Sequence, residues 1–131
     1  MNYLLDVNAL VALSHAQHAL HPRARAWYIR VNAPTARFHT CAITELGFVR
    51  VSVQTGLQLD VQAARKALAA LKASTPNPFE ILADAVGVER LPGFVRTPSK
   101  LTDGHLLELA RHHGACLATL DSAIPGALLI P

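Results

Sequence analysis

The chain opens with an uninterrupted apolar run that ends in a carboxylate. Residues 3–5 are Tyr, Leu and Leu, and Asp6 follows them directly. A run without polar/apolar alternation is typical of a strand that is covered on both faces, as in a parallel sheet flanked by helices. Ligands bind beyond the carboxyl ends of such strands, so Asp6 is predicted to lie at a ligand site.

Apolar residues recur at helical spacing in several segments. They predict helices over residues 7–13, from Pro22 to about Val31, from Ala42 onward, between Asp60 and Thr75, and over residues 101–113. Shorter apolar runs predict strands at residues 38–41, 79–83, 115–119 and 128–130. The alternation of strands and helices predicts an α/β fold class, a three-layer α/β/α sandwich around a mainly parallel central sheet of four to five strands. Residues 1–131 are expected to form a single domain.

Three details of the helices can be predicted from the residue types. Asp60 is expected to cap the helix that follows it, and Ser99 or Thr102 to cap the helix that begins near residue 101. On the helix after Asp60, the spacing of the apolar residues places Lys72 on the outer face, and this helix is predicted to be structural.

Three histidines occur three residues apart, at His15, His18 and His21. This spacing would suit metal ligands on one continuous helix. The segment instead runs into Pro22 and has the composition of a polar turn. We therefore expect solvated histidines rather than a zinc site.

Three further acids fall where a parallel sheet would bring them to the same edge as Asp6. Glu45 and Asp103 each occupy the first turn of a predicted helix, on the face that carries its apolar residues. Asp121 follows the strand at residues 115–119, as Asp6 follows the first strand. For Glu45 alone, a favourable charge at a helix N-terminus explains the position equally well. The repetition of the pattern at Asp103 favours a shared acidic site.

Four carboxylates in one site indicate a divalent cation. Each pair at about 6 Å would repel by roughly 3 kcal/mol at an effective dielectric near 20, and a bound cation removes this cost. Ligands that are all oxygen favour Mg²⁺, with Mn²⁺ able to substitute. Such a site can activate water for the hydrolysis of a phosphodiester. The sequence has no GxSxG elbow, P-loop or GxGxxG motif that would indicate other chemistry.

The charge distribution fits a polyanionic substrate. The net charge is +3, and four of the nine acids are the candidate site residues, against twelve Lys and Arg. A cluster of acidic residues on an otherwise basic protein is typical of a metal-dependent enzyme that acts on nucleic acid. Residues 91–100 form a predicted loop that carries Arg96 and Lys100 just before Asp103, and these two residues are expected to hold the substrate backbone. An ordinary surface connection explains the loop equally well.

Composition gives weaker expectations about the environment of the chain. Cys41 and Cys116 are lone cysteines without a CxxC pair, so we expect buried reduced thiols. No basic and apolar leader and no apolar stretch of about 18 residues is present, so a soluble cytoplasmic protein that does not bind a membrane is expected. Hydrophobic residues make up 51% of the chain, which suggests apolar surface for a partner.

Four motifs resemble those of a known family. They are Leu4-Leu5-Asp6-Val7-Asn8, Ile43-Thr44-Glu45-Leu46-Gly47, Leu101-Thr102-Asp103-Gly104-His105-Leu106 and Leu117-Ala118-Thr119-Leu120-Asp121. In order and spacing, they are similar to the four acidic motifs of PIN-domain ribonucleases, and the chain most resembles the VapC-type toxins of bacterial toxin–antitoxin pairs. The resemblance covers nearly the whole chain, and the set of four motifs is more specific than any one of them.

The resemblance implies a role for particular residues. The catalytic metal ligands would be Asp6, Glu45, Asp103 and Asp121. Asn8 would support the site by hydrogen bonding, and Thr119 of the last motif is also expected to support it. Many relatives carry a further acid two residues after the last aspartate, where this chain has Ala123. The number of metal ions, one or two, therefore stays open.

The resemblance also implies partners and an activity. It implies a homodimer and an antitoxin whose segment packs on the apolar surface and places a basic side chain in the acidic pocket. The leading hypothesis is a Mg²⁺-dependent endoribonuclease toxin. One alternative keeps the metal chemistry but acts on DNA or a small phosphoester, and the other is a non-catalytic interaction module whose acids bind structural metal or cap helices.

Overall fold

Five short strands form the centre of the molecule. The structure is a computed structural model that describes all residues, 1–131. The strands are β1 (Asn2–Leu5), β2 (Arg37–Cys41), β3 (Glu80–Leu82), β4 (Cys116–Thr119) and β5 (Leu128–Leu129). They form one sheet in the order β3-β2-β1-β4-β5, in which every pairing is parallel. This confirms the predicted α/β fold and its parallel sheet.

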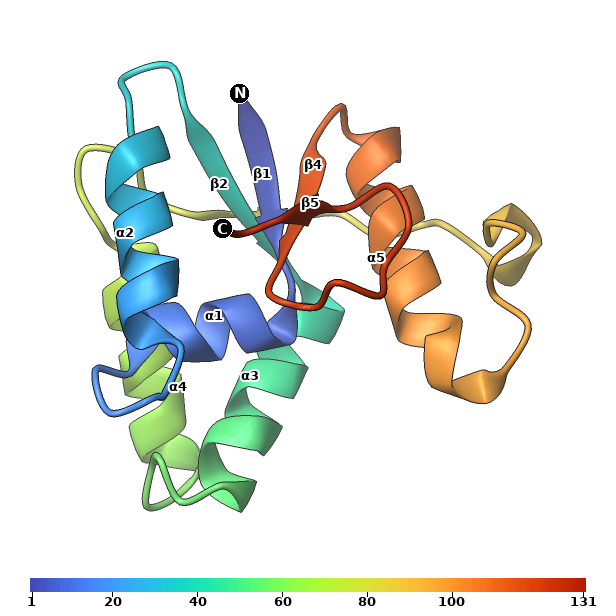
Figure 1. Ribbon diagram of the computed structural model, residues 1–131. Helices are drawn as coiled ribbons and strands as arrows, with labels where there is room; N and C mark the ends of the chain where they lie inside the picture. The colour runs from blue at the N-terminus through green and yellow to red at the C-terminus, as the bar shows by residue number, and fades with distance from the viewer.

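Helices cover both faces of this sheet. They are α1 (Val7–Ser14), α2 (His21–Val31), α3 (Ala42–Gln54), α4 (Val61–Lys72) and α5 (Leu101–His112), with 3₁₀ turns η1 (Val88–Arg90) and η2 (Pro98–Lys100) before α5. In Figure 1, α2 lies on one side of the sheet and α5 on the other, while α3 and α4 form a hairpin beyond the ends of the strands near α1. None of the helices is long and apolar enough to cross a membrane.

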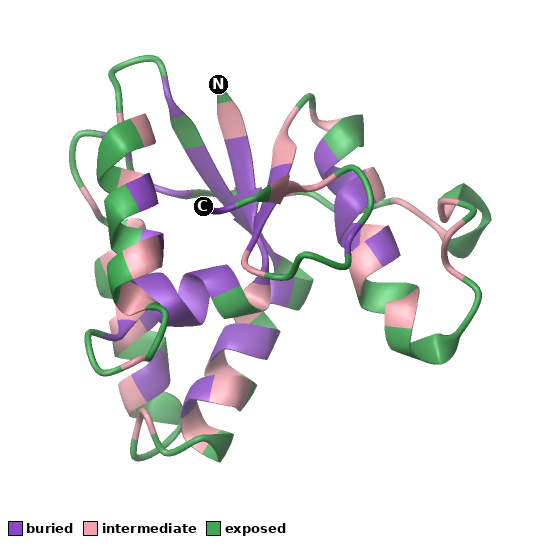
Figure 2. Ribbon diagram, in the orientation of Figure 1, coloured by how far each residue is buried: buried purple, intermediate pink, exposed green.

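The first strand separates two apolar cores. Tyr3 and Leu5 belong to the larger core, which includes Trp27 of α2 and Phe38 of β2. Leu4 belongs to the smaller core under α5. These three residues of β1 are buried, as Figure 2 shows for the central strands. The apolar run without alternation therefore predicted correctly that this strand is covered on both faces.

The predicted cap of α5 is wrong. The helix begins after Lys100, and no side chain caps it. Ser99 is instead hydrogen-bonded to Thr97, with 3.0 Å between their hydroxyl oxygens. The reason is that η2 runs directly into α5, so the Lys100 N–H already donates to the Thr97 carbonyl. The other predicted cap is confirmed, because Asp60 Oδ1 accepts a hydrogen bond from the Ala63 N–H at 2.8 Å.

The prediction of solvated histidines is wrong for His15, which is only 2% exposed. Its Nδ1 donates to the Val11 carbonyl at 2.8 Å, and its Nε2 lies 3.0 Å from Gln58 Nε2. The ring also stacks on Phe48 of α3. His21 is partly buried, with Nδ1 2.8 Å from the Ala12 carbonyl. The local sequence could not show that α3 and the turn after it cover this segment.

Both cysteines are free thiols. Cys41 is fully buried at the end of β2, as expected, whereas Cys116 in β4 is only partly buried.

Candidate active site

Asp6 lies where β1 ends and α1 begins. Its backbone N–H donates to the Ala118 carbonyl at 3.1 Å, which extends the pairing of β1 with β4 to this residue. Its Oδ1 caps α1 by accepting from the Ala9 N–H at 2.8 Å. The side chain is buried, with 7% of the residue exposed. The end of a central strand therefore holds this carboxylate in one position at the carboxyl edge of the sheet.

Thr119, the last residue of β4, connects two of the predicted acids. Its hydroxyl donates to Asp6 Oδ2 at 2.5 Å and accepts from the Asp121 N–H at 3.0 Å. Asp121 Oδ1 in turn accepts from the Ala123 N–H at 2.8 Å, which closes the turn after β4. A fully buried threonine thus fixes Asp6 relative to the turn that carries Asp121.

Asp103 approaches this pair from the first turn of α5. Burial is the main cause that raises the pKa of Asp103 above its ordinary value of 3.8, and the charge of Asp121 raises it further. Lys100 acts in the opposite direction. Gly104, the next residue, is buried, and a side chain there would overlap Val95 of the preceding loop. Close packing of this loop therefore fixes the start of α5.

The charge of Asp6 is also affected by its neighbours. Burial raises the pKa of its carboxyl group above the ordinary value of 3.8. The hydrogen bonds from Thr119 and the backbone act against this rise, and the charges of Asp103 and Asp121 add to it. We call Asp6, Asp103 and Asp121 the aspartate trio. None of its members forms an ion pair with a cationic side chain.

Glu45, the fourth predicted acid, is held by a different set of residues. Its Oε2 accepts from the Thr40 hydroxyl at 2.5 Å and from Lys72 Nζ at 2.6 Å. Thr40 is fully buried in β2, and Lys72 comes from the last turn of α4. Lys72 was predicted to lie on the outer face of α4, and this is wrong because the contact of α4 with α3 brings it to Glu45.

The four acids fit a divalent cation in chemistry, although they do not surround a common point. No group of three or more His, Cys, Asp or Glu side chains lies close enough together to hold a metal ion. The trio nevertheless presents carboxylate oxygens, the ligands that Mg²⁺ prefers, and none of its members is in an ion pair. The pKa values of Asp6 and Asp103 are raised, mainly by burial, and the charges of the neighbouring carboxylates raise them further. The roles of these residues as metal ligands stay a prediction.

The remaining predicted site residues, Asn8, Arg96 and Lys100, form few contacts with the four acids. Asn8 is exposed in the first turn of α1, and its side chain forms no hydrogen bond. Arg96 is exposed, and its Nε lies 3.5 Å from the Gly93 carbonyl. Lys100 lies close enough to Asp103 for its charge to lower the pKa of that residue. The structure therefore brings Lys100 near the trio, and the proposed roles of Asn8 and Arg96 stay predictions.

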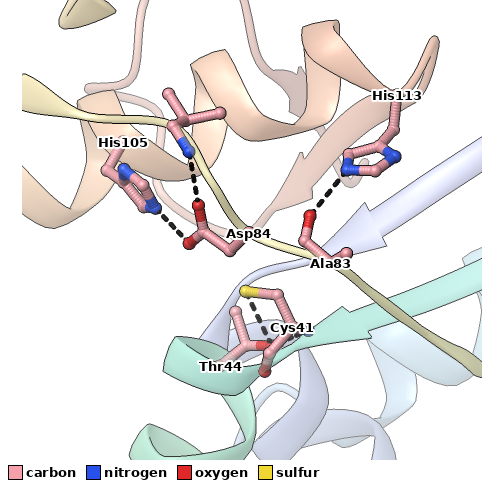
Figure 3. Close-up of polar contacts among 7 residues, drawn as sticks. Cys41, Thr44, Ala83, Asp84, His105 and His113 are labelled. Carbon is pink, nitrogen blue, oxygen red and sulfur yellow. Dashed lines mark hydrogen bonds and ion pairs between the residues drawn. The ribbon is translucent and has the colours of Figure 1, made fainter. Parts of the chain in front are cut away.

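A second polar cluster, which the sequence did not reveal, joins α5 to the segment after β3. His105 Nε2 lies 2.5 Å from Asp84 Oδ2, and the Val86 N–H donates to Asp84 Oδ1 at 3.1 Å. Further along α5, His113 Nε2 donates to the Ala83 carbonyl at 2.7 Å. Figure 3 shows both histidines reaching from the helix to this segment. These contacts help to fix the position of the helix that carries Asp103.

The cluster also affects the charge of Asp84. Burial tends to raise the pKa of Asp84, and the hydrogen bonds from His105 and the Val86 N–H lower it. The nearby charges of His105 and His113 act in the same direction as these bonds, so the pKa lies below the ordinary value of 3.8. The two histidines and the Val86 N–H thus favour the ionised form of Asp84.

A groove of about 520 Å³ runs between α3 and α4 and reaches Glu45. Its polar lining residues are Glu45, Arg50, Arg65 and Lys72, and its apolar lining includes Leu46, Val49 and Leu68. Leu46, which is 65% exposed, is one of the residues that line it. We call this feature the α3–α4 groove.

Comparisons with known proteins give consistent results. The family model for the PIN domain matches residues 3–126. Ribonuclease VapC38 from Mycobacterium tuberculosis is 42% identical over 126 residues, which span 92% of this chain and 86% of that protein. Ribonuclease VapC29 from the same species is 37% identical over 138 aligned positions, which span 100% and 98% of the two chains.

A solved structure has the same fold. The crystal structure of M. tuberculosis VapC20, described as a toxin that cleaves the sarcin-ricin loop, superposes with a TM-score of 0.68. The match covers 98% of this chain and 99% of that one, at 17% sequence identity. At this identity the likeness concerns the fold alone.

Proposed function

We propose that this chain, which belongs to the PIN-domain family and within it to the VapC ribonucleases, is a metal-dependent endoribonuclease that acts as the toxin of a toxin–antitoxin pair. The observation that carries the proposal is the aspartate trio at the carboxyl edge of the sheet, whose members form no ion pair with a cationic side chain. The identity of 42% to a ribonuclease over most of both chains supports RNA as the substrate.

In the proposed reaction, the trio and Glu45 would hold Mg²⁺, or Mn²⁺ in its place. The ion would supply positive charge at the scissile phosphate and make water a better nucleophile. Thr119 keeps the Asp6 carboxylate in place through the hydrogen bond to Oδ2. The capping bond from Ala9 leaves Oδ1 fixed as well, so both oxygens of Asp6 are oriented before the substrate arrives.

The proposed substrate contacts come from the segment before α5. Lys100 lies near Asp103, and Arg96 is exposed in the same segment. Side chains of this kind bind phosphate groups and position a nucleic acid without reading its sequence. The choice of RNA rather than DNA, and the bond that is cut, are therefore not explained by these two residues. Action on cellular RNA would place the protein in the cytoplasm.

Purified protein with RNA, single-stranded DNA and a small phosphoester tests this proposal. We expect cleavage of RNA with Mg²⁺, loss of cleavage with EDTA, and products that end in 5′-phosphate and 3′-hydroxyl groups. Hydrolysis by water does not use the 2′-hydroxyl, so 2′,3′-cyclic phosphates would rule out the proposed reaction. Equal cleavage of DNA or the phosphoester would favour the second interpretation, and metal binding without turnover would favour the non-catalytic one.

We propose that the antitoxin binds in the α3–α4 groove. We also propose that the chain forms a homodimer. An amphipathic segment would pack its apolar face on the lining of the groove, and its basic residue would have to displace Lys72 from Glu45. Leu46→Asp, at the exposed Leu46, should abolish inhibition by an antitoxin encoded beside this chain while cleavage persists. Light scattering after size exclusion, with and without that antitoxin, tests the homodimer.

A further inference from the structure

Glu45 is the one predicted site acid that already has a cationic partner. Lys72 Nζ and Glu45 Oε2 are 2.6 Å apart, with 28% and 23% of the two side chains exposed. The Thr40 hydroxyl donates to the same oxygen. Two donors therefore use Oε2, and Oε1 is left without a hydrogen bond.

The position of Lys72 is fixed by the fold rather than by its flexible side chain alone. It lies in the last turn of α4, and its carbonyl accepts from the Phe79 N–H at 2.8 Å. Leu68, one turn earlier, is buried in the core. The ammonium group is thus delivered to Glu45 by a packed helix, unlike the exposed Lys66 of the same helix, which forms no ion pair.

We infer that Lys72 is a built-in cation that competes with a divalent metal ion for Glu45. An ammonium group and a divalent ion on one carboxylate would lie within a few ångström of each other and repel strongly. A metal ion that uses Glu45 must therefore displace Lys72 toward the α3–α4 groove. This inference rests on the proposed metal site and assigns to Lys72 a role that opposes metal binding.

Ala123 stands where many relatives carry another acid, and this makes the competition more important. With fewer carboxylates available, the site depends more on Glu45 to hold an ion firmly. Asp121 Oδ1 is also used, because it accepts from the Ala123 N–H. An ammonium group at Glu45 should then weaken metal binding measurably. The protein would therefore bind the metal ion only at a higher concentration of that ion.

Titration of metal-free protein with Mn²⁺ in a calorimeter tests the inference without using cleavage. Lys72→Met removes the ammonium group and keeps a long side chain. We expect it to bind Mn²⁺ roughly two- to fivefold more tightly than wild type, the range that loss of a partly exposed ion pair allows. Lys66→Met removes the same charge from an exposed position of α4 and should change the affinity much less.

A second pair of variants shows whether the effect passes through Glu45. In a Glu45→Gln background, Lys72→Met should not tighten Mn²⁺ binding further, because Lys72 and the metal ion then no longer compete for the Glu45 carboxylate. Lys72→Arg keeps the positive charge and should bind Mn²⁺ no more tightly than wild type. Thermal melting in EDTA verifies that each variant is folded, and Lys72→Gln replaces Lys72→Met if that variant does not fold.

Three results would overturn the inference. Equal affinities of Lys72→Met and Lys66→Met would show that only net charge matters. Weaker binding by Lys72→Met would show that Lys72 positions Glu45 for the metal instead of competing with it. Tightening that persists in the Glu45→Gln background would show an effect through other groups. If no variant binds Mn²⁺, the proposed metal site fails as well, whereas normal binding and cleavage with an unchanged Lys72→Met affinity refute only this inference.

Discussion

The aspartate trio and Glu45 lie on different parts of the fold, and their charges are balanced in different ways. The trio comes from the ends of β1 and β4 and the start of α5, and the side chains of Asp6 and Asp121 accept hydrogen bonds only from neutral groups. Glu45 starts α3 and receives the ammonium group of α4. Burial raises the pKa values of Asp6 and Asp103, whereas Glu45 has an ion pair. The trio therefore lacks the ion-pair partner that Glu45 has, and we expect a bound metal ion to reduce the repulsion between its carboxylates.

The largest expected effect comes from Asp103→Asn. Cleavage should fall by at least about 100-fold, because the change removes a proposed ligand of the ion that supplies the chemistry. In metal-free protein near neutral pH, the variant should melt at the same temperature as wild type or higher, since it relieves repulsion from Asp121. Initial rates of RNA cleavage and melting curves in EDTA measure both effects.

The control for this prediction lies on the same helix. Glu108 is near Arg90 and Arg111, at 3.9 and 4.0 Å, and has no part in the proposed chemistry. Glu108→Gln should leave cleavage close to the wild-type rate. If Asp103→Asn instead lowers metal-free stability by more than about 1 kcal/mol, the carboxylate serves as a hydrogen-bonding partner, and the contrast with Glu45 fails.

Loss of the Thr119 hydroxyl should have the next largest effect. Thr119→Val keeps the shape of the side chain but leaves Asp6 Oδ2 and the Asp121 N–H without their buried partner. An unsatisfied buried polar group costs about 1–3 kcal/mol, so unfolding by urea should show a loss in this range. Thr119→Ser retains the hydroxyl and should recover most of the loss. Similar stabilities for the valine and serine variants would show that the hydroxyl does not support the trio.

The trio should also give the metal-free protein an unusual dependence on pH. A carboxyl group whose pKa is raised on folding binds more protons in the native state, so stability falls as pH rises from 3.8 through the folded value. Asp84, whose pKa is lowered, has the opposite effect, and its contribution is lost as pH falls below 3.8.

Denaturation in EDTA at several pH values between 4 and 7 measures this dependence. The free energy of unfolding of wild type, minus that of Asp103→Asn, should decrease as pH rises. A saturating divalent ion should remove that trend, because it binds the ionised form. A difference that does not vary with pH would mean that Asp103 has no raised pKa.

The sequence predicted where the residues of the trio lie in the fold, but it did not predict that Lys72 is the partner of Glu45. The run of residues 3–5 without alternation predicted a strand covered on both faces, and the pairing of β1 with β4 places Asp6 beside Thr119. Lys72 was assigned to an outer face because helical periodicity describes one helix at a time. The packing of α4 against α3 decides where its ammonium group lies. The same limit applies to His15 and to the contact of His105 with Asp84, which join segments far apart in the chain.

The smallest expected effect concerns the basic side chains on the trio's side of the site. Arg96→Ala with Lys100→Ala should weaken RNA binding and flatten its dependence on salt, by about 0.7 in the log–log slope for each phosphate group that is no longer neutralised. Binding of Mn²⁺ should stay the same or become slightly tighter, because the variant removes the positive charge of Lys100 near Asp103. Arg25→Ala with Arg30→Ala removes the same charge from the exposed face of α2, on the other side of the sheet, and serves as the control. If both pairs change the salt slope equally, the basic surface attracts RNA without a defined path. A larger change for Arg96 and Lys100 would instead assign the substrate to the side of the site where the aspartates lie, away from Lys72.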